Sequence, residues 1–246
     1  MIDLHCHYLP GIDDGAQVLD EALDLARAAV HSGITTAVLT PHVHPGRYEN
    51  TAASIRSLCA AFRRVLQHKQ IPLDVRAGGE VRISPEILGL VQENQIPFVG
   101  EMDGYNILLL EFPHSHLVVG AEKLIDWLLA RRIRPLIAHP ERNKEVMRKV
   151  DKIEPFVRMG CMLQLTGASV SGEFGQSALE CARKIIERDW AAVVATDAHN
   201  LKHRPPNLDV AYRALVQLGG ESLARRLTVD TPARIVGIPA QRAAVA

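Results

Sequence analysis

Several features that would assign a chain to a broad class are scarce or missing here. Aromatic residues make up only 4% of the 246 residues, and 28 Lys and Arg residues are balanced by 28 Asp and Glu residues. The sequence has no basic stripe with interleaved aromatic residues. Together with the balanced charge, this predicts that the protein is not a nucleic-acid binder driven by bulk charge. No apolar run approaches the roughly 18 residues that a membrane-spanning helix needs. We therefore expect no membrane insertion.

Secretion signals and disulfide motifs are also missing. The amino terminus has no basic segment followed by an apolar stretch, which predicts that no secretory signal is present. The four cysteines lie far apart and form no C-x-x-C pair; they are Cys6, Cys59, Cys161 and Cys181. Together these features predict reduced thiols in a cytoplasmic protein rather than a disulfide framework.

The chain does contain a regular alternation of strand-like and helical patterns. Apolar strand-like runs recur at 2–7, 36–40, 73–78, 106–111, 135–139, 161–165 and 191–196. Helical periodicity occurs between most of them, at 20–31, 51–68, 119–130, 145–159, 177–188 and 208–218. Strand then helix, repeated about every 30 residues, predicts βα units and a parallel sheet, and seven units predict a closed or nearly closed barrel. We expect one domain over 1–246, a short last helix from Thr231-Pro232 and a frayed end at 241–246.

The first strand-like run carries two histidines, His5 and His7. Residues 2–7 alternate apolar and polar, which is typical of a half-buried strand, and residues two apart on a strand face the same way. A similar pair, Asp197 and His199, follows the last apolar run. We therefore expect both ends of the chain to fold onto one metal site.

Metal-ligand residue types also follow most of the other strand-like runs. They are Asp14 in the loop behind the first run, His42 after the second, Glu80 after the third, Glu111 ending the fourth and His139 ending the fifth. Taken singly, each has a structural explanation, such as a turn residue, a strand-end charge or a satisfied core imidazole. In a βα barrel the carboxyl ends of the strands meet on one face. Their coincidence there favours a metal site.

Together these motifs carry a resemblance to a known family. D-x-H-x-H, T-P-H-x-H, G-G-E, L-x-E-F-P, A-H-P-E-R and T-D-A-H occur in this order between residue 1 and about residue 205. The chain thereby resembles the PHP (polymerase and histidinol phosphatase) superfamily, and within it the metal-dependent protein-tyrosine phosphatases encoded with bacterial capsule and exopolysaccharide genes. Asp13-Asp14-Gly15 and the loop 166–175 match this branch as well.

The resemblance implies a fold and a set of ligands. The fold is a distorted seven-stranded (β/α) TIM-like barrel with three divalent metal ions, Mn²⁺ as the first choice and Fe, Co or Zn as alternatives. The implied ligands are His5, His7, Glu80 and Asp197 for the first ion, Glu80, Glu111 and His139 for the second, and Asp14, His42 and His199 for the third. Arg142 and Arg204 fall where the family places phosphate-binding arginines.

The implied activity is hydrolysis of phosphotyrosine on a bacterial tyrosine autokinase that regulates capsular or exopolysaccharide synthesis. A cysteine nucleophile would need C-x5-R, but the sixth residues after the four cysteines are Ile12, Val65, Gly167 and Glu187. We therefore expect metal-dependent attack by water, without a phospho-enzyme. Two alternatives stay open, a small-molecule phosphatase of the histidinol-phosphate type and a non-catalytic metal-binding scaffold. The oligomeric state stays open too, as does a general acid, for which His44, His114 and His203 are candidates.

Overall fold

The computed structural model describes residues 1–239, and its strands form two sheets. The strands are β1 (Ile2–Cys6), β2 (Thr36–Leu39), β3 (His42–Val43), β4 (Asp74–Ala77), β5 (Glu80–Arg82), β6 (Gly100–Met102), β7 (Tyr105–Glu111), β8 (Ile133–Ala138), β9 (Met162–Thr166) and β10 (Ala191–Ala195). β1, β2 and β4 form a parallel three-stranded sheet. The second sheet runs in the order β10-β9-β8-β7-β5-β3, all parallel, and β6 pairs antiparallel with β7.

Two chain segments pass from one sheet into the other, because β2 leads into β3 and β4 leads into β5. Gly78 and Gly79 form the second passage. A Cβ at Gly78 would lie 2.7 Å from Val38 Cγ1, and one at Gly79 would lie 2.3 Å from Pro97 Cγ. Only glycine fits this close approach of the chain to its neighbours, and the passage delivers Glu80 to the start of β5.

The first strand also lies beside the end of the last one. Cys6 forms a parallel bridge with Ala198, the Asp197 amide donates to the His5 carbonyl over 2.7 Å, and the His7 amide donates to the Ala198 carbonyl over 2.9 Å. The expectation that both ends of the chain fold onto one place is confirmed.

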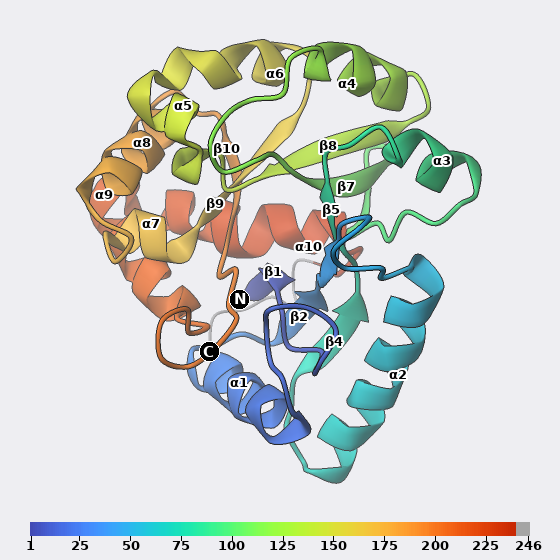
Figure 1. Cartoon of the computed structure of the whole chain (residues 1–246). Coiled ribbons are helices and arrows are strands. Elements are labelled where there is room, and N and C mark those ends of the chain that lie inside the picture. The colour runs from blue at the N-terminus through green and yellow to red at the C-terminus, as the bar shows by residue number, and fades with distance from the viewer. Residues whose placement is uncertain (240–246) are drawn as a thin grey trace.

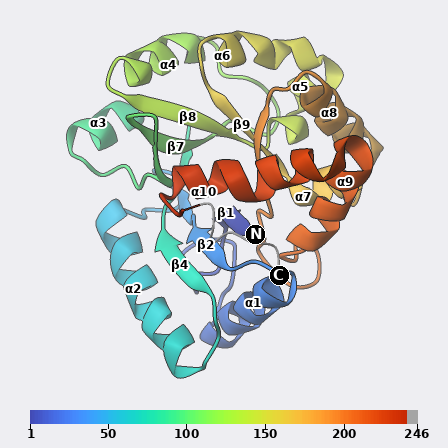
Figure 2. The same ribbon diagram turned by 180° about the vertical axis from the view of Figure 1, so that it is seen from behind.

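Helices cover the outside of the sheets (Figure 1). They are α1 (Leu19–His31), α2 (Ala52–His68), α3 (Ile87–Gln92), α4 (Ala121–Leu129), α5 (Lys144–Arg148), α6 (Glu154–Arg158), α7 (Gly167–Ser171), α8 (Gln176–Glu187), α9 (Leu208–Arg225) and α10 (Thr231–Ile235), with the 3-10 turns η1 (Pro140–Arg142) and η2 (Val150–Ile153) and the π-helical turn η3 (Arg226–Asp230). Seen from behind, α9 and α10 cross the face of the molecule next to β1 (Figure 2). Buried apolar side chains from β1 to α10 form one cluster.

The structure corrects the sequence prediction at several elements. The run 2–7 was expected to be half-buried, but every residue of β1 is buried, because neighbouring elements cover both faces of the strand. Residues 145–159 form α5, η2 and α6 instead of one helix, since Lys149 has an extended backbone. α9 continues past the predicted end through a kink at Gly219 and Gly220.

Three further findings concern the rest of the described chain. The loop expected over 166–175 contains the short helix α7. Among residues 1–239, no helix combines the length and the apolar character needed to cross a membrane. The predicted frayed end at 241–246 lies outside the described residues.

Candidate metal centre

His5 and His7 lie at the carboxyl end of β1 with their rings turned toward one point. Their Nε2 atoms are 3.2 Å apart. His5 Nδ1 lies 2.9 Å from Gln164 Oε1, and His7 Nδ1 lies 2.7 Å from Asp13 Oδ2. Amide and carboxylate oxygens accept hydrogen bonds, so each Nδ1 donates, and each Nε2 is left to bind a proton or a metal ion. This is how outer partners orient metal-binding histidines.

Glu80 and Asp197 bring two carboxylates to the same point. Glu80 Oε2 lies 3.3 Å from His5 Nε2 and 3.6 Å from His7 Nε2. Asp197 Oδ1 lies 3.2 Å and 3.4 Å from the same two atoms. Both residues are buried, and these two oxygens face only the rings of candidate ligands, His42 Nδ1 lying 2.9 Å from Glu80 Oε2. Buried carboxylate oxygens are costly unless a cation or donor satisfies them, so the four side chains fit a shared cation.

Asp14, His42 and His199 form the side of the site that is nearer to solvent. Asp14 Oδ1 lies 3.2 Å from His42 Nε2 and 3.5 Å from His199 Nε2. His199 Nδ1 donates to the Asp197 carbonyl over 2.9 Å, which leaves a buried Nε2 atom without a hydrogen-bond partner. At this third histidine too, a hydrogen bond from Nδ1 orients the ring and leaves Nε2 available to bind a metal ion.

Glu111 and His139 approach the site from β7 and from the turn after β8. His139 Nε2 lies 2.9 Å from Glu80 Oε1, and Glu111 Oε2 lies 4.0 Å from His42 Nδ1. His139 and Asp197 both have positive φ, 34° and 54°. Non-glycine residues adopt this region rarely, and such backbone strain concentrates at functional sites.

All nine residues predicted as metal ligands lie together in the structure. Their donor atoms form four overlapping groups: His7, Asp14, His42 and His199; His5, His7 and Glu80; His5, His139 and Asp197; and His42, Glu80 and Glu111. Glu111 is thus grouped with His42, whereas the family-based grouping placed it with His139. Imidazole nitrogens mixed with carboxylate oxygens suit Mn, Fe, Co or Zn. With the buried oxygens of Glu80 and Asp197 that face the candidate ligands, the donor set fits divalent metal ions.

Close carboxylates change the protonation of the histidines in the metal-free protein. Burial lowers the pKa of His5 and of His42, but carboxylates outweigh it, Glu80 foremost, and raise the pKa to about 9 for His5 and about 11 for His42. Burial raises the pKa of Glu80 and of Asp197, but the adjacent His5 holds both pKa values well below their usual range. Metal ions therefore compete with protons for these donors.

Arg142 and Arg204 meet at one carboxylate oxygen of this centre. Both guanidinium groups donate to Asp197 Oδ2. The Arg142 guanidinium also lies 5.0 Å from the centre of the Phe174 ring, and Arg204 Nε is buried without a partner. Burial lowers the pKa of Arg142, but Asp197 outweighs it and raises the pKa. Both arginines are thus charged, anchored at one end and rich in remaining donors.

Comparison with known proteins agrees with this geometry. The family model for capsular polysaccharide synthesis proteins CpsB/CapC matches residues 1–237. The chain belongs to the CpsB/CapC family. It is 35% identical to the tyrosine-protein phosphatase YwqE of Bacillus subtilis, over 93% of this chain and 89% of that protein. It is 28% identical to the tyrosine-protein phosphatase CpsB of Streptococcus pneumoniae, over 96% of this chain and 98% of that protein.

Solved structures agree with the family assignment. A chain from the crystal structures of YwqE and CpsB, which are described as unique metal-dependent tyrosine phosphatases, has a TM-score of 0.84 at 34% identity. The match covers 94% of this chain and 96% of that one. A lactonase from Listeria monocytogenes has a TM-score of 0.56 at 15% identity over 95% of this chain and 93% of the lactonase. That likeness concerns the fold alone.

In this CpsB/CapC chain, several partners of the predicted ligands were not identified from the sequence. Asp13 and Gln164 hold His7 and His5, as described above. Buried Glu141 accepts from the Thr166 amide over 3.0 Å and from the Ser169 hydroxyl over 2.7 Å, and so ties the turn that carries Arg142 to α7. Asp13 and Glu141 each stand within a recognised motif, which is the only signal that could have pointed to them.

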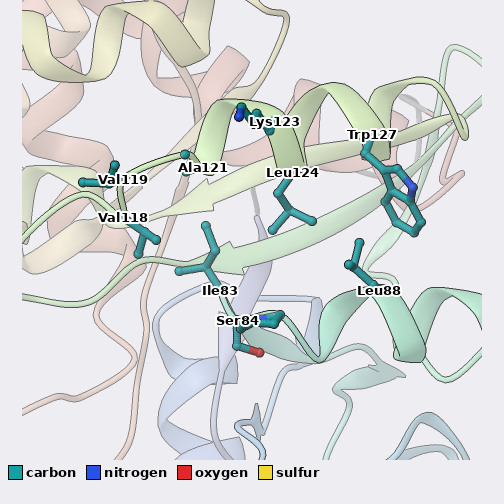
Figure 3. A pocket seen from close by; sticks show the side chains of 11 residues that line it. Ile83, Ser84, Leu88, Val118, Val119, Ala121, Lys123, Leu124 and Trp127 are labelled. Carbon is teal, nitrogen blue, oxygen red and sulfur yellow. The ribbon is translucent and has the colours of Figure 1, made fainter.

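Two of the cavities in the structure have similar volumes, but the residues that line them differ in kind. The cavity above the ligands measures about 350 Å³ and includes Arg142, Arg204, His44 and His114, whereas His203 is exposed and does not line it. A second cavity of about 370 Å³ is apolar, and side chains such as Leu88, Leu124 and Trp127 face it from α3 and α4 (Figure 3). The two volumes are alike, but of these two cavities only the first combines imidazoles, carboxylates and arginines, whereas Lys123 is the single charged residue that lines the second.

Proposed function

We propose that this chain is a metal-dependent protein-tyrosine phosphatase that acts on the phosphotyrosine-bearing tail of a bacterial tyrosine autokinase controlling capsular or exopolysaccharide synthesis. The observation that carries the proposal is the convergence of nine imidazole and carboxylate ligands beneath a cavity whose lining includes Arg142 and Arg204. The family match and the relatives named tyrosine-protein phosphatases support the choice of substrate.

The nine ligands would hold three divalent ions, with Mn²⁺ as our first choice and Fe, Co or Zn as alternatives. His5, His7, Glu80 and Asp197 would hold one, Glu80 with Glu111 and His139 a second, and Asp14, His42 and His199 a third. Bound ions would supply an activated water and offset charge on the phosphate oxygens. Four carboxylates do not cancel the charge of three divalent ions, so the site stays attractive to a phosphate dianion.

Arg142 and Arg204 would bind and orient the phosphate. Each is anchored to Asp197 through one part of its guanidinium group. The remaining N–H groups form a fork that matches two phosphate oxygens. The anchoring carboxylate keeps both arginines in place, so substrate binding requires little further ordering of these side chains.

Of the histidines that line the cavity, His44 and His114 are not candidate metal ligands, and neither is well suited to act as a general acid at neutral pH. Burial, and next to it the charge of Arg82, lowers the pKa of His44; burial, and next to it Arg142, lowers the pKa of His114. Both imidazoles are therefore neutral near pH 7. A phenolate leaves more readily than an alkoxide, so this site can hydrolyse phosphotyrosine without a strong protein acid.

The cysteines support a mechanism without a thiolate nucleophile. All four are buried free thiols. Burial raises the pKa of Cys6 well above its ordinary value, that of Cys59 to about 11, and those of Cys161 and Cys181 to about 12. A buried thiol with a raised pKa is a poor nucleophile. Free thiols also fit the cytoplasmic location that we propose.

We further propose that the sheets close into one distorted barrel within a single domain. β2 with β3, and β4 with β5, each act as one bent strand, and β6 pairs only with β7 outside the main order, which leaves seven strands around the structure. The contacts of Cys6 and Ala198 between β1 and the end of β10 support closure at the remaining gap. In such a barrel the ligands occupy the carboxyl ends of the strands, where barrel enzymes place their chemistry.

The test is phosphatase activity of metal-stripped protein with Mn²⁺ titrated back. We expect Mn²⁺-dependent hydrolysis of a phosphotyrosine peptide, abolished by His42→Ala and retained by His68→Ala, a control at an exposed histidine at the end of α2. Preference for histidinol phosphate would move the protein to a small-molecule role. Stoichiometric metal binding without hydrolysis of either substrate would make it a metal-binding scaffold.

A further inference from the structure

The cavity above the metal centre contains four arginines in two separate pairs. Arg142 and Arg204 meet at Asp197, as described above. Arg47 and Arg82 also line the cavity. His44 lines the same cavity, and the Arg47 amide donates to the His44 carbonyl over 2.9 Å. The proposed phosphate position uses the first pair and leaves the second without a role.

Arg82 is held at the cavity wall by the β7 strand end. Its Nη1 lies 3.0 Å from Glu111 Oε1 and 3.4 Å from the Phe112 carbonyl oxygen. Glu111 therefore offers one oxygen to Arg82 and the other toward His42. Because Nη1 makes both of these contacts, the other N–H groups of Arg82 can meet a substrate.

Arg47 is positioned by an ordered turn rather than by an acidic partner. The His44 amide donates to the Tyr48 carbonyl over 3.1 Å, and the Tyr48 amide donates to the His44 carbonyl over 2.8 Å. The Arg47 guanidinium lies 4.9 Å from the centre of the Tyr48 ring, and that ring stacks on His42 at 5.4 Å with an interplanar angle of 12°. Within residues 1–239, no carboxylate lies at ion-pair distance from Arg47, which is exposed.

Charge complementarity then decides what these arginines bind. The carboxylates that line the cavity are all candidate metal ligands; they are Asp14, Glu80, Glu111 and Asp197. None of them is free to neutralise Arg47. We propose that Arg47, with Arg82 and His44, forms a second anion subsite, which binds a carboxylate or second phosphate on the substrate chain near the phosphotyrosine. The inference rests on the proposed function and adds that the substrate segment is anionic beyond its scissile phosphate.

The geometry also limits the distance between Arg47 and the metal-ligand candidate His42. The stacking distances put the Arg47 guanidinium no more than about 10 Å from the centre of the His42 ring. In an extended peptide, side chains two residues apart point the same way and are separated by about 7 Å. A second anion two residues from the phosphotyrosine is compatible with this limit, and we choose that spacing for the test.

Peptide binding tests this without relying on turnover. Fluorescent peptides carry a non-hydrolysable phosphonate analogue of phosphotyrosine, and two residues away, on either side, Glu, Gln or a second phosphonate residue. Anisotropy gives Kd for Mn²⁺-loaded wild type, Arg47→Gln, Arg47→Lys and Arg64→Gln, a control that removes the same charge from an exposed position on α2. Comparing the Glu and bis-phosphonate peptides separates the two sources of the anion.

We expect wild type and Arg64→Gln to bind an anionic peptide about fivefold more tightly than the Gln peptide, the upper range for an exposed ion pair. Arg47→Gln should remove most of this preference, Arg47→Lys should keep much of it, and added salt should reduce it. Equal Kd values for the anionic and neutral peptides in wild type overturn the subsite, as does a preference that persists in Arg47→Gln. Hydrolysis of p-nitrophenyl phosphate, measured separately, tests the proposed function: its absence overturns that function, whatever the peptide preference.

Discussion

Replacing Gln164 by methionine should weaken metal binding without removing any ligand. Gln164 is fully buried on β9, its Oε1 accepts from His5 Nδ1 over 2.9 Å, and its Nε2 atom has no partner. Methionine keeps nearly the same shape and volume, so the change removes little more than this acceptor. The His5 ring can then carry its hydrogen on Nε2, the atom that faces His7 and the carboxylates.

The size of the effect follows from the role of Gln164 as a hydrogen-bond partner that orients a metal-binding histidine. Loss of such a partner lowers metal affinity by about 10- to 100-fold, or about 1.4–2.7 kcal/mol. The stabilisation gained from bound metal falls by the same amount. For a protein of this size about 1 kcal/mol moves Tm by about 2–4 °C, so the rise in Tm on adding Mn²⁺ should shrink by about 3–11 °C. The metal-free variant should also lose about 1–3 kcal/mol, because a buried donor is left unsatisfied.

Competition with a fluorescent chelator gives the Kd for Mn²⁺, and calorimetry gives Tm with and without metal. Gln164→Glu keeps an acceptor at the same place and should restore much of the affinity. Gln176→Met changes an exposed glutamine on α8 and should leave the affinity unchanged. A folded Gln164→Met protein that binds Mn²⁺ as tightly as wild type would refute the idea that this amide orients His5.

Four further predictions concern protons, phosphate and packing. Because the pKa values of His5 and His42 are raised to about 9 and about 11, Mn²⁺ binding at pH 7 should release protons, and a pH-stat that detects none would contradict this. The raised histidine pKa values stabilise the metal-free protein fully below about pH 6.5, where histidine is protonated in the unfolded chain as well. This stabilisation is lost as pH rises through the folded-state pKa values, so the Tm of the metal-free protein should fall from pH 7 to 10. Arg142→Ala should lower kcat/KM for a phosphotyrosine peptide about 100-fold, as measured by steady-state kinetics, whereas an unchanged value would exclude phosphate binding by this side chain. Gly79→Ala should lower the free energy of unfolding by about 1–3 kcal/mol in urea titrations, because its Cβ would lie 2.3 Å from Pro97 Cγ; Gly89→Ala, with open space around its Cβ, is the control and should show no such loss.

Much of the ligand set could be predicted from the sequence because strand ends are local features. His5 and His7 stand two apart on a strand, and that spacing alone makes them face one way. Glu80 follows a strand-like run that breaks at Gly78 and Gly79, so its place next to a strand boundary is also visible locally, although the structure makes it the first residue of β5. The repeating strand and helix patterns predicted a parallel sheet, which then placed these ends on one face.

The boundaries and burial of individual elements could not be predicted as well. β1 alternates apolar and polar residues like a half-buried strand, yet it is buried throughout. His5 turns inward, where it meets Gln164, Glu80 and Asp197, and Asp3 accepts a hydrogen bond from the Thr196 hydroxyl. Only the packing of distant segments provides such partners, so a periodicity argument cannot anticipate them.

The sequence by itself determined which residue types stand at the strand ends, and hence the kind of chemistry this protein can hold. The tertiary structure alone decided which of these residues meet: it brought Glu111 close to His42 and Glu80, paired Asp13 with His7, and brought Arg47 and Arg82 into the lining of one cavity. The physical reason is the range of the interactions. Side-chain direction along a strand follows from backbone geometry over two residues, whereas a ligand set depends on distances of a few ångströms between residues far apart in the chain.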